Sequence, residues 1–150
     1  MTDTLDTRPR VLFLCTHNSA RSQMAEGLLR HYAANQVVVQ SAGSDPRPVH
    51  PVAVAVLAEM GIDISQQQSK HLETMRGQSF DYVITICDDI YEQCPDYPGN
   101  PIRLHWGLPD PSATPPESIE QRIAFQQVAR LLVEHIRTLL VMIPHRHSVA

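Results

Sequence analysis

A cysteine and an arginine stand six positions apart near the start of the chain, with small and polar residues between them. The two residues are Cys15 and Arg21. A loop of this length can curl so that its backbone N–H groups point at one oxyanion, and the guanidinium of Arg21 adds a fork of donors. The residues expected to bind the oxyanion are Thr16, His17, Asn18, Ser19, Ala20, Arg21 and Ser22. The motif predicts an anion-binding loop with a thiol beneath the anion.

Cys15 is predicted to be the nucleophile of this loop. It follows an apolar run (11–14) typical of a buried strand, and helix-forming residues come directly after the loop. The helix dipole and Arg21 both favour the thiolate, and in such settings the pKa of a cysteine falls from about 8.5 to roughly 3.5–7.5. The Ser22 hydroxyl can add a hydrogen bond to the sulfur. The alternative is a buried cysteine at a strand end beside a surface arginine.

Two further cysteines, Cys87 and Cys94, lie in the second half of the chain, and no secretory signal pattern precedes them. Three cysteines in such a chain argue against a structural disulfide framework. They suit one nucleophilic cysteine and a second pair that can form a disulfide. Zinc is the competing interpretation. Neither cysteine has the close Cys or His partner that a tetrahedral site uses, and the eight histidines are scattered. We therefore expect no metal site and no cofactor.

Length and charge restrict the partners that this chain can have. Its 150 residues suit one domain, which we place at 10–142, between a flexible lead-in at 1–9 and a polar tail at 143–150. The net charge of −4 argues against nucleic acid, and no apolar stretch approaches the ~20 residues of a membrane span. The acidic N-terminus lacks a secretory pattern, so we expect a cytoplasmic protein, and we expect a monomer.

Strand-like and helix-like segments alternate along the chain. Strands are predicted at 11–14, 37–41, 80–87 and 102–106, and helices at 22–34, 51–60, about 70–75 and 116–142. This alternation is typical of an α/β three-layer sandwich, with a four-stranded parallel sheet flanked by helices. Because ligands bind beyond the carboxyl ends of parallel strands, Cys15, Cys87 and Asp110 are expected to converge at one edge. The apolar positions of the last helix are Ile119, Ile123, Val128, Leu131, Leu132, Ile136 and Leu139.

Residues 15–26, CTHNSARSQMAE, resemble the phosphate-binding loop of the low-molecular-weight protein tyrosine phosphatases. They look even more like the loop of the arsenate reductases that share this fold. Cys87 and Cys94, with six residues between them, and the segment HWGLPDP at 105–111 are similar to the thioredoxin-coupled branch of these reductases. The resemblance extends over 11–140, nearly the whole chain. It implies a low-molecular-weight phosphatase-like fold and an arsenate reductase that acts in arsenic detoxification.

The resemblance implies a relay of three cysteines. Arsenate, with phosphate or sulfate as competing oxyanions, would bind the loop, and Cys15 would attack arsenic while Asp110 acts as general acid. Cys87 would then attack Cys15, releasing arsenite and leaving a Cys15–Cys87 disulfide. Cys94 would attack Cys87 in turn, and thioredoxin would reduce the last disulfide. Glutaredoxin or another thiol is the alternative reductant.

The resemblance also assigns four residues to the support of the loop. Reductases of this family that bind potassium behind the loop use an Asn, a Glu, a Ser and an Asp. Asn18, Glu26 and Ser41 match three of these positions, but Lys70 stands at the fourth. The Lys70 ammonium group is expected to replace the metal ion, so we expect no potassium requirement.

The spacing of Cys87 and Cys94 has a geometric consequence. If residues 88–93 are helical, a rise of ~1.5 Å per residue separates the two Cα atoms by about 10 Å. A disulfide requires a separation below about 7 Å. We therefore predict that this segment rearranges when the disulfide forms.

Two other functions are compatible with the same motifs. A low-molecular-weight tyrosine phosphatase or other phosphomonoesterase would use Cys15, Arg21 and Asp110, with the other cysteines as redox protection. Tyrosine phosphatases of this fold have tyrosines after the Asp-Pro pair, whereas here Ser112 follows. A non-enzymatic arsenic or oxidant sensor would use the thiols without turnover. His17 is expected to pack or face solvent, and Trp106 to lie in the core.

Overall fold

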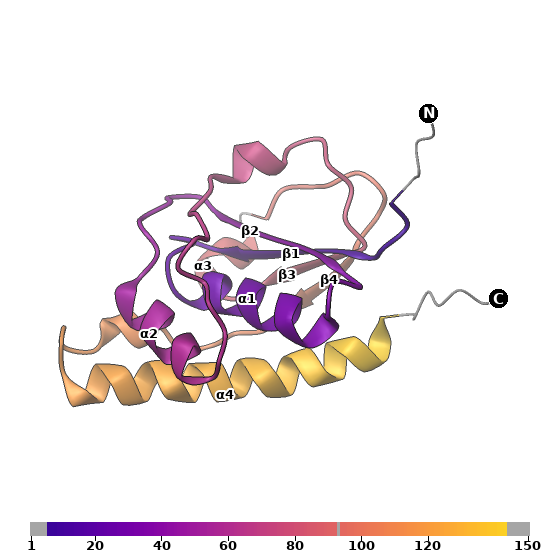
Figure 1. Ribbon diagram of the computed structural model, residues 1–150. Helices are drawn as coiled ribbons and strands as arrows, with labels where there is room; N and C mark the ends of the chain where they lie inside the picture. The colour runs from indigo at the N-terminus through magenta and orange to yellow at the C-terminus, as the bar shows by residue number, and fades with distance from the viewer. Residues whose placement is uncertain (1–5, 93, 144–150) are drawn as a thin grey trace.

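The computed structural model describes residues 6–92 and 94–143. A four-stranded parallel sheet lies at its centre, with the strand order β2-β1-β3-β4 (Figure 1). The strands are β1 (Arg10–Cys15), β2 (Val38–Gly43), β3 (Tyr82–Thr85) and β4 (Ile102–His105). Residues 1–5 of the predicted lead-in and 144–150 of the predicted tail lie outside the described residues.

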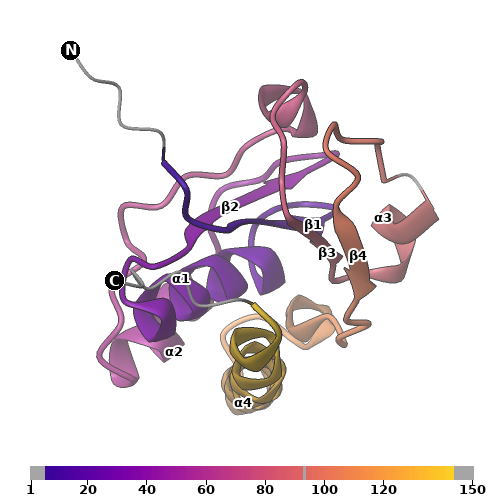
Figure 2. The same cartoon turned by 90° about the vertical axis from the view of Figure 1, so that its right-hand side faces the viewer.

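Helices cover both faces of the sheet, which confirms the predicted three-layer α/β sandwich (Figure 2). The helices on one face are α1 (Arg21–Ala33), α2 (Pro51–Glu59) and α4 (Ile119–Met142). The opposite face carries shorter elements, the 3-10 helix η1 (Leu72–Met75) and the helix α3 (Asp88–Glu92). A second 3-10 helix, η2 (Pro111–Ala113), follows β4. None of the helices in the described part of the chain combines the length and the apolarity needed to cross a bilayer.

The central strand β1 divides its side chains between two cores. Val11 and Phe13 pack with the helices α1, α2 and α4, whereas Leu12 and Leu14 pack with Met75 on the other face. These four β1 side chains are completely buried. A strand that is covered on both faces needs apolar residues at every position, which explains the continuous apolar run in the sequence.

The register of the sheet brings the ends of the strands to one edge. Cys15, at the end of β1, pairs with Gly43 of β2, and Thr85 of β3 pairs with His105 of β4. Because all pairs are parallel, the loops that leave β1, β2, β3 and β4 emerge on the same side. This is the edge where the sequence predicts the site.

Several element boundaries differ from the prediction. The strand predicted at 80–87 ends at Thr85, so Cys87 lies in the bend before α3 and not in the strand. Trp106 follows the end of β4 and is buried, with its ring centroid 5.6 Å from that of Phe13. Its predicted place in the core is confirmed.

The last helix begins three residues after the predicted start, because Ser118 caps it by accepting a hydrogen bond from the Gln121 N–H. Ile119 and Ile123, predicted to face the core, are exposed. Leu131 is also exposed beyond a third of its surface, at 37%. The buried stripe instead consists of Gln121, Phe125, Val128, Ala129, Leu132, Ile136 and Leu139. Hydrophobicity alone could not predict which face of this helix packs against the core, because its apolar residues extend beyond one face.

Gly27 of α1 provides a test of the packing between α1 and the segment after α2. A Cβ atom at this position would lie 2.4 Å from Ile64 Cγ2, which sits on a branched carbon and cannot swing away freely. Overpacking of this kind costs about 1–3 kcal/mol, more than the ~1 kcal/mol that alanine gains over glycine in a helix. We expect Gly27→Ala to lower the free energy of unfolding measured in urea.

The double variant Gly27→Ala/Ile64→Ala is the control for this prediction. Removal of Ile64 Cγ2 relieves the clash, so the two substitutions should destabilise the protein by less than the sum of their separate effects. Additive effects would show that the close contact does not control the packing here.

Candidate active site

The loop between β1 and α1 is held against the end of β2. A Cβ atom at Gly43 would lie 2.6 Å from the carbonyl oxygens of both Cys15 and Thr16, so only glycine allows this approach. Asn18 adopts a left-handed backbone conformation with φ of 46°, which asparagine tolerates better than most residues. The sequence analysis missed Gly43, although a glycine at the end of a strand beside a predicted loop is a recognisable signal.

The loop opens into a cavity of about 230 Å³ at the carboxyl edge of the sheet. Its lining residues are polar, charged or small: Cys15, His17, Ser19, Ala20, Arg21, Arg47, His50, Asp110 and Ser112. The four basic residues of this set come from two segments: His17 and Arg21 from the loop after β1 and the start of α1, and Arg47 and His50 from the connection between β2 and α2. The cavity therefore suits a small, compact anion, and none of its lining residues offers a flat apolar surface for an aromatic ring.

Arg21 and Asp110 face each other across this cavity. The Arg21 side chain is only 11% exposed; its Nη1 donates to the Leu108 carbonyl oxygen at 2.9 Å and its Nη2 lies 3.9 Å from Asp110 Oδ2. The segment after β4 thus orients the guanidinium, and Cys15 and Asp110, which were predicted to converge with Cys87 at one edge, line the same cavity.

The Asp110 carboxyl group caps η2. Its Oδ1 accepts hydrogen bonds from the Ser112 N–H at 2.9 Å and the Ser112 hydroxyl at 2.7 Å. Burial raises the pKa of Asp110, but the Ser112 donors and the positive charges of Arg21 and His17 outweigh it, so the net pKa lies below its usual value. Without an anion in the cavity, Asp110 is therefore ionised at neutral pH.

Cys87 lies against Cys15, which lines the cavity. Its sulfur accepts a hydrogen bond from the Thr16 N–H at 3.3 Å and contacts the Thr16 hydroxyl at 3.1 Å. The Ile90 N–H, in the first turn of α3, also donates to this sulfur. Thr16 was predicted to bind the oxyanion, but the structure turns its amide and hydroxyl toward Cys87, because β1 and β3 are neighbours in the sheet.

The two sulfurs share a proton, which changes the expected charge of Cys15. The Cys15 thiol donates to Cys87, and this bond, together with the Thr16 donors, lowers the pKa of Cys87 to about 5 despite its burial. The same hydrogen bond, with burial, raises the pKa of Cys15, although Arg21 opposes the rise. The prediction of a low pKa for Cys15 considered the loop alone, whereas in the substrate-free site the negative charge of the pair lies on Cys87.

Asn18 is a buried hub behind the loop. Its Nδ2 donates to the hydroxyls of Ser22 at 2.8 Å and Ser41 at 2.9 Å. Its Oδ1 accepts from Gln23 Nε2 at 3.1 Å and from the Lys70 N–H at 2.8 Å. The side chain is thereby fully satisfied and ties the loop to α1, β2 and the segment before η1. Asn18 and Ser22 thus lie behind the cavity lining and support the loop.

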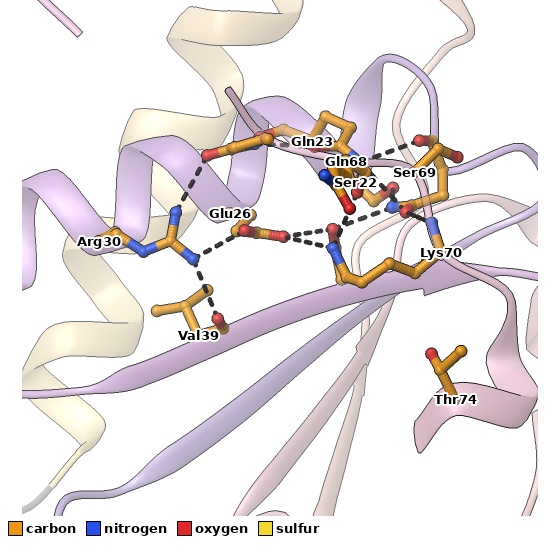
Figure 3. Close-up of polar contacts among 12 residues, drawn as sticks. Ser22, Gln23, Glu26, Arg30, Val39, Gln68, Ser69, Lys70 and Thr74 are labelled. Atoms are coloured by element: carbon orange, nitrogen blue, oxygen red, sulfur yellow. Dashed lines mark hydrogen bonds and ion pairs between the residues drawn. The ribbon is translucent and has the colours of Figure 1, made fainter. Parts of the chain in front are cut away.

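Glu26 is a buried carboxylate behind the same hub, and two cations neutralise it (Figure 3). Its Oε2 accepts from Arg30 Nη2 at 2.7 Å, and its Oε1 lies 3.6 Å from Lys70 Nζ. The Ser41 hydroxyl donates to Oε1 at 2.5 Å. Such a carboxylate is stable in the interior only when it is paired and hydrogen-bonded. The four predicted support residues thus form one network, to which Arg30 adds a cation that the sequence analysis missed.

The fit of a potassium ion can be judged from this network. Lys70 Nζ donates to the Gln68 carbonyl oxygen at 2.9 Å and points toward Glu26 (Figure 3). An ammonium group already provides the positive charge beside the carboxylate, so the residues do not fit a metal ion. Among the residues the structure describes, no cluster of His, Cys, Asp or Glu side chains suits a metal ion.

His17 and His50 both line the cavity; His17 was expected among the oxyanion-binding residues of the loop, whereas sequence analysis missed His50. His17 Nδ1 lies 3.4 Å from Asp45 Oδ2. His50 Nδ1 accepts from the Val52 N–H as the N-cap of α2, so in the neutral ring Nε2 carries the proton. Burial lowers the pKa of His50, which favours this neutral form. A histidine directly before a proline at a helix start was the available signal.

Cys94 lies apart from the cavity lining, beside β4. The helix α3 covers residues 88–92, so most of the segment between Cys87 and Cys94 is helical, as the geometric argument supposed. Cys94 is half-buried, and its sulfur accepts a hydrogen bond from Arg103 Nη1 at 2.8 Å. All three cysteines are free thiols in this structure.

The shared proton of Cys15 and Cys87 can be tested by titration. In a Cys94→Ser background, the thiolate of the pair should persist at neutral pH and disappear as the pH falls through about 5. Cys15→Ala removes the largest stabilising donor, so the midpoint should rise, and Thr16→Val should raise it less. Ultraviolet thiolate absorbance against pH measures the midpoint. A midpoint that stays near its original value in Cys15→Ala would exclude the shared proton.

Salt-dependent melting tests the role of Lys70. We expect no change in Tm of the unaltered protein when potassium chloride replaces sodium chloride. In sodium chloride, Lys70→Asp should lower the free energy of unfolding by about 1–3 kcal/mol, because Glu26 loses one of its cations. Part of this stability should return in potassium chloride specifically. Lys70→Met, which adds no carboxylate, is the matched control and should show the loss without recovery. A marked potassium-specific rise in the unaltered protein would overturn this assignment.

Comparison with known proteins agrees with this geometry. Residues 10–148 match the family described as low molecular weight phosphotyrosine protein phosphatase. An arsenate reductase of Shouchella clausii is 41% identical over 118 residues, 79% of this chain and 85% of the relative. A solved arsenate reductase in the phosphate binding state is 33% identical, with a TM-score of 0.73, covering 91% of this chain and 99% of that one. A thioredoxin-dependent arsenate reductase of Corynebacterium glutamicum is 37% identical, with a TM-score of 0.70. The match covers 90% of this chain and 61% of that one. The chain therefore belongs to the low molecular weight phosphotyrosine protein phosphatase family, as the loop motif indicated.

Proposed function

We propose that this protein reduces arsenate to arsenite through a relay of Cys15, Cys87 and Cys94. The observation that supports it best is the second thiol, which lies beside the Cys15 thiol of the cavity lining. Cys87 lies within hydrogen-bonding reach of Cys15, and its pKa is about 5. A hydrolase needs only the nucleophile and an acid at this place, whereas a reductase needs a second thiol that can reach the first.

The first step forms the bond between Cys15 and arsenic. Arsenate binds in the loop against Arg21, the proton of Cys15 passes to Cys87, and the Cys15 sulfur attacks arsenic. An oxygen of arsenate leaves as water. Asp110, 3.9 Å from Arg21 Nη2, donates the proton to this oxygen. The carboxyl group takes up that proton when the anion enters, because a nearby negative charge raises its pKa and offsets the effect of Arg21.

The second step carries the reduction. Cys87 releases to solvent the proton that it took from Cys15, and its thiolate, held by the Thr16 donors, attacks the Cys15 sulfur. The sulfur–arsenic bond breaks and its electron pair stays on arsenic, so arsenic(V) becomes arsenic(III) and two thiols become one disulfide. Cys94 then attacks Cys87, the Cys15 thiolate leaves, and a Cys87–Cys94 disulfide remains for an external dithiol.

The helix α3 must rearrange for the last step. Residues 88–92 are helical, and a segment that is helical from Cys87 to Cys94 would separate their Cα atoms by about 10 Å, which exceeds the span of a disulfide. We propose that α3 unwinds and exposes the disulfide to its reductant. Thioredoxin is the proposed reductant, because the similar reductase of Corynebacterium glutamicum is thioredoxin-dependent. We further propose that the protein works as a monomer in the cytoplasm.

Phosphate-ester hydrolysis is the second candidate function. The family description supports it, and Cys15, Arg21 and Asp110 would suffice for the chemistry. The lining of the cavity favours the first candidate, because Ser112 follows the Asp-Pro pair and His17, Arg47 and His50 form a polar rim. A sensor that binds arsenic without turnover would use the same three thiols.

A coupled assay distinguishes these functions. Arsenate-dependent oxidation of NADPH, measured with thioredoxin and thioredoxin reductase, should be abolished by Cys15→Ser, Cys87→Ser and Cys94→Ser. Asp110→Asn should reduce the rate by about a hundredfold or more, the usual contribution of a general acid. The exposed arginine Arg122 of α4, which pairs with Glu59 of α2, provides the control Arg122→Gln with unchanged turnover.

Other outcomes have definite meanings. Hydrolysis of a phosphate ester that needs Cys15 but neither Cys87 nor Cys94, without arsenate turnover, would make the protein a phosphatase. Arsenite binding without any turnover would make it a sensor.

A further inference from the structure

Cys94 is held by an arginine from the edge strand β4. Arg103 Nη1 donates to the Cys94 sulfur at 2.8 Å, and Nη2 donates to the Pro95 carbonyl oxygen at 2.9 Å. Nη2 also lies 3.4 Å from Asp96 Oδ1. One guanidinium thus binds three successive residues through two nitrogens, a geometry that the fork of arginine allows and the single ammonium of lysine does not.

The backbone of Arg103 belongs to the sheet. It pairs with Val83 across the ladder between β4 and β3, and the backbone of this strand is fixed by the sheet. Its side chain is 39% exposed, so the guanidinium can follow a moving partner while its Cα stays in place. Cys94 belongs to the segment after α3, which must change shape before Cys87 and Cys94 can join.

The charges around Cys94 make this contact important. Burial raises the pKa of the Cys94 thiol, and the carboxylate of Asp96 acts in the same direction. Arg103 opposes both through its charge and its hydrogen bond. Tyr97 also faces this thiol, with Glu73 of η1 beside it, and neither contributes a positive charge. Arg103 is therefore the group that limits the rise.

We propose that Arg103 is a positioning residue for the resolving step: its guanidinium holds the sulfur of Cys94 and favours the thiolate that attacks Cys87. The proposal rests on the relay described above. In this step the Cys94–Cys87 bond forms, the Cys87–Cys15 bond breaks, and Cys15 leaves with the electron pair as a thiolate. No external oxidant or reductant takes part. The attacking group must be a thiolate, and Arg103 supports that state directly.

The magnitude follows from the charge pair. An opposite charge in contact with a thiolate shifts its pKa by about one unit or more, so loss of Arg103 should reduce the thiolate fraction of Cys94 about tenfold at neutral pH. The more basic thiolate is intrinsically more nucleophilic, with a Brønsted coefficient of ~0.4–0.5, so the observed rate should fall only about threefold.

The first experiment measures Cys94 without any turnover. In a Cys15→Ala/Cys87→Ala background, Cys94 is the remaining thiol, and its alkylation by iodoacetamide is followed against pH. Arg103→Gln should move the profile about one unit to higher pH, and Arg103→Lys, which keeps the charge, should move it less. Arg76→Gln is the matched control: Arg76 lines the same hollow as Pro95 and Asp96 but pairs with Glu73, so the profile should not move.

The second experiment measures the resolving step itself. The otherwise unaltered Arg103→Gln protein is mixed with arsenate without thioredoxin, quenched in acid, and mapped by mass spectrometry. Arsenite release and the Cys15–Cys87 disulfide should form at the normal rate, while conversion to Cys87–Cys94 slows about threefold. An unchanged alkylation profile, or unchanged conversion, would overturn the proposal. If no arsenite is released by the unaltered protein, the proposed reductase function fails, whereas the alkylation result still decides the role of Arg103.

Discussion

The contact between the sulfurs of Cys15 and Cys87 is the interaction on which the rest of the site depends. It exists because β1 and β3 are adjacent parallel strands whose carboxyl ends lie at the same edge. Thr16, the first residue after β1, reaches across to Cys87 with both its amide and its hydroxyl. A small change in the register of these two strands would separate the thiols and remove their shared proton.

The charge balance of the cavity follows from this contact. One negative charge on the thiol pair faces Arg21, while Asp110 lies 3.9 Å from the same guanidinium. The positive charge of Arg21 therefore stabilises both the negative charge of the thiol pair and that of Asp110. In the proposed mechanism, an entering oxyanion takes over the guanidinium, so that Asp110 becomes protonated and Cys15 becomes the attacking thiolate. On this proposal the substrate itself produces the charge distribution that the chemistry requires.

Buried polar groups hold the loop in the shape that this balance needs. Asn18 satisfies four partners, and Glu26 is neutralised by Arg30 and Lys70. Each group would be costly to bury alone, so the network is stable only when it is complete. A rigid loop on one side contrasts with the short helix α3 on the other. Cys15 belongs to the rigid part, whereas Cys87 and Cys94 border the part that is proposed to move.

The sequence by itself determined the alternating elements, the parallel sheet and the loop motif that places the chain in its family, because these depend on local periodicity and on motif spacing. It did not determine the protonation of Cys15, the orientation of Thr16, the need for glycine at position 43 or the contact of Arg103 with Cys94. These properties arise between residues far apart in the chain, such as Thr16 and Cys87. Only the tertiary structure decided them, because a pKa and a steric limit depend on which atoms are in contact. The register of the strands determines those contacts.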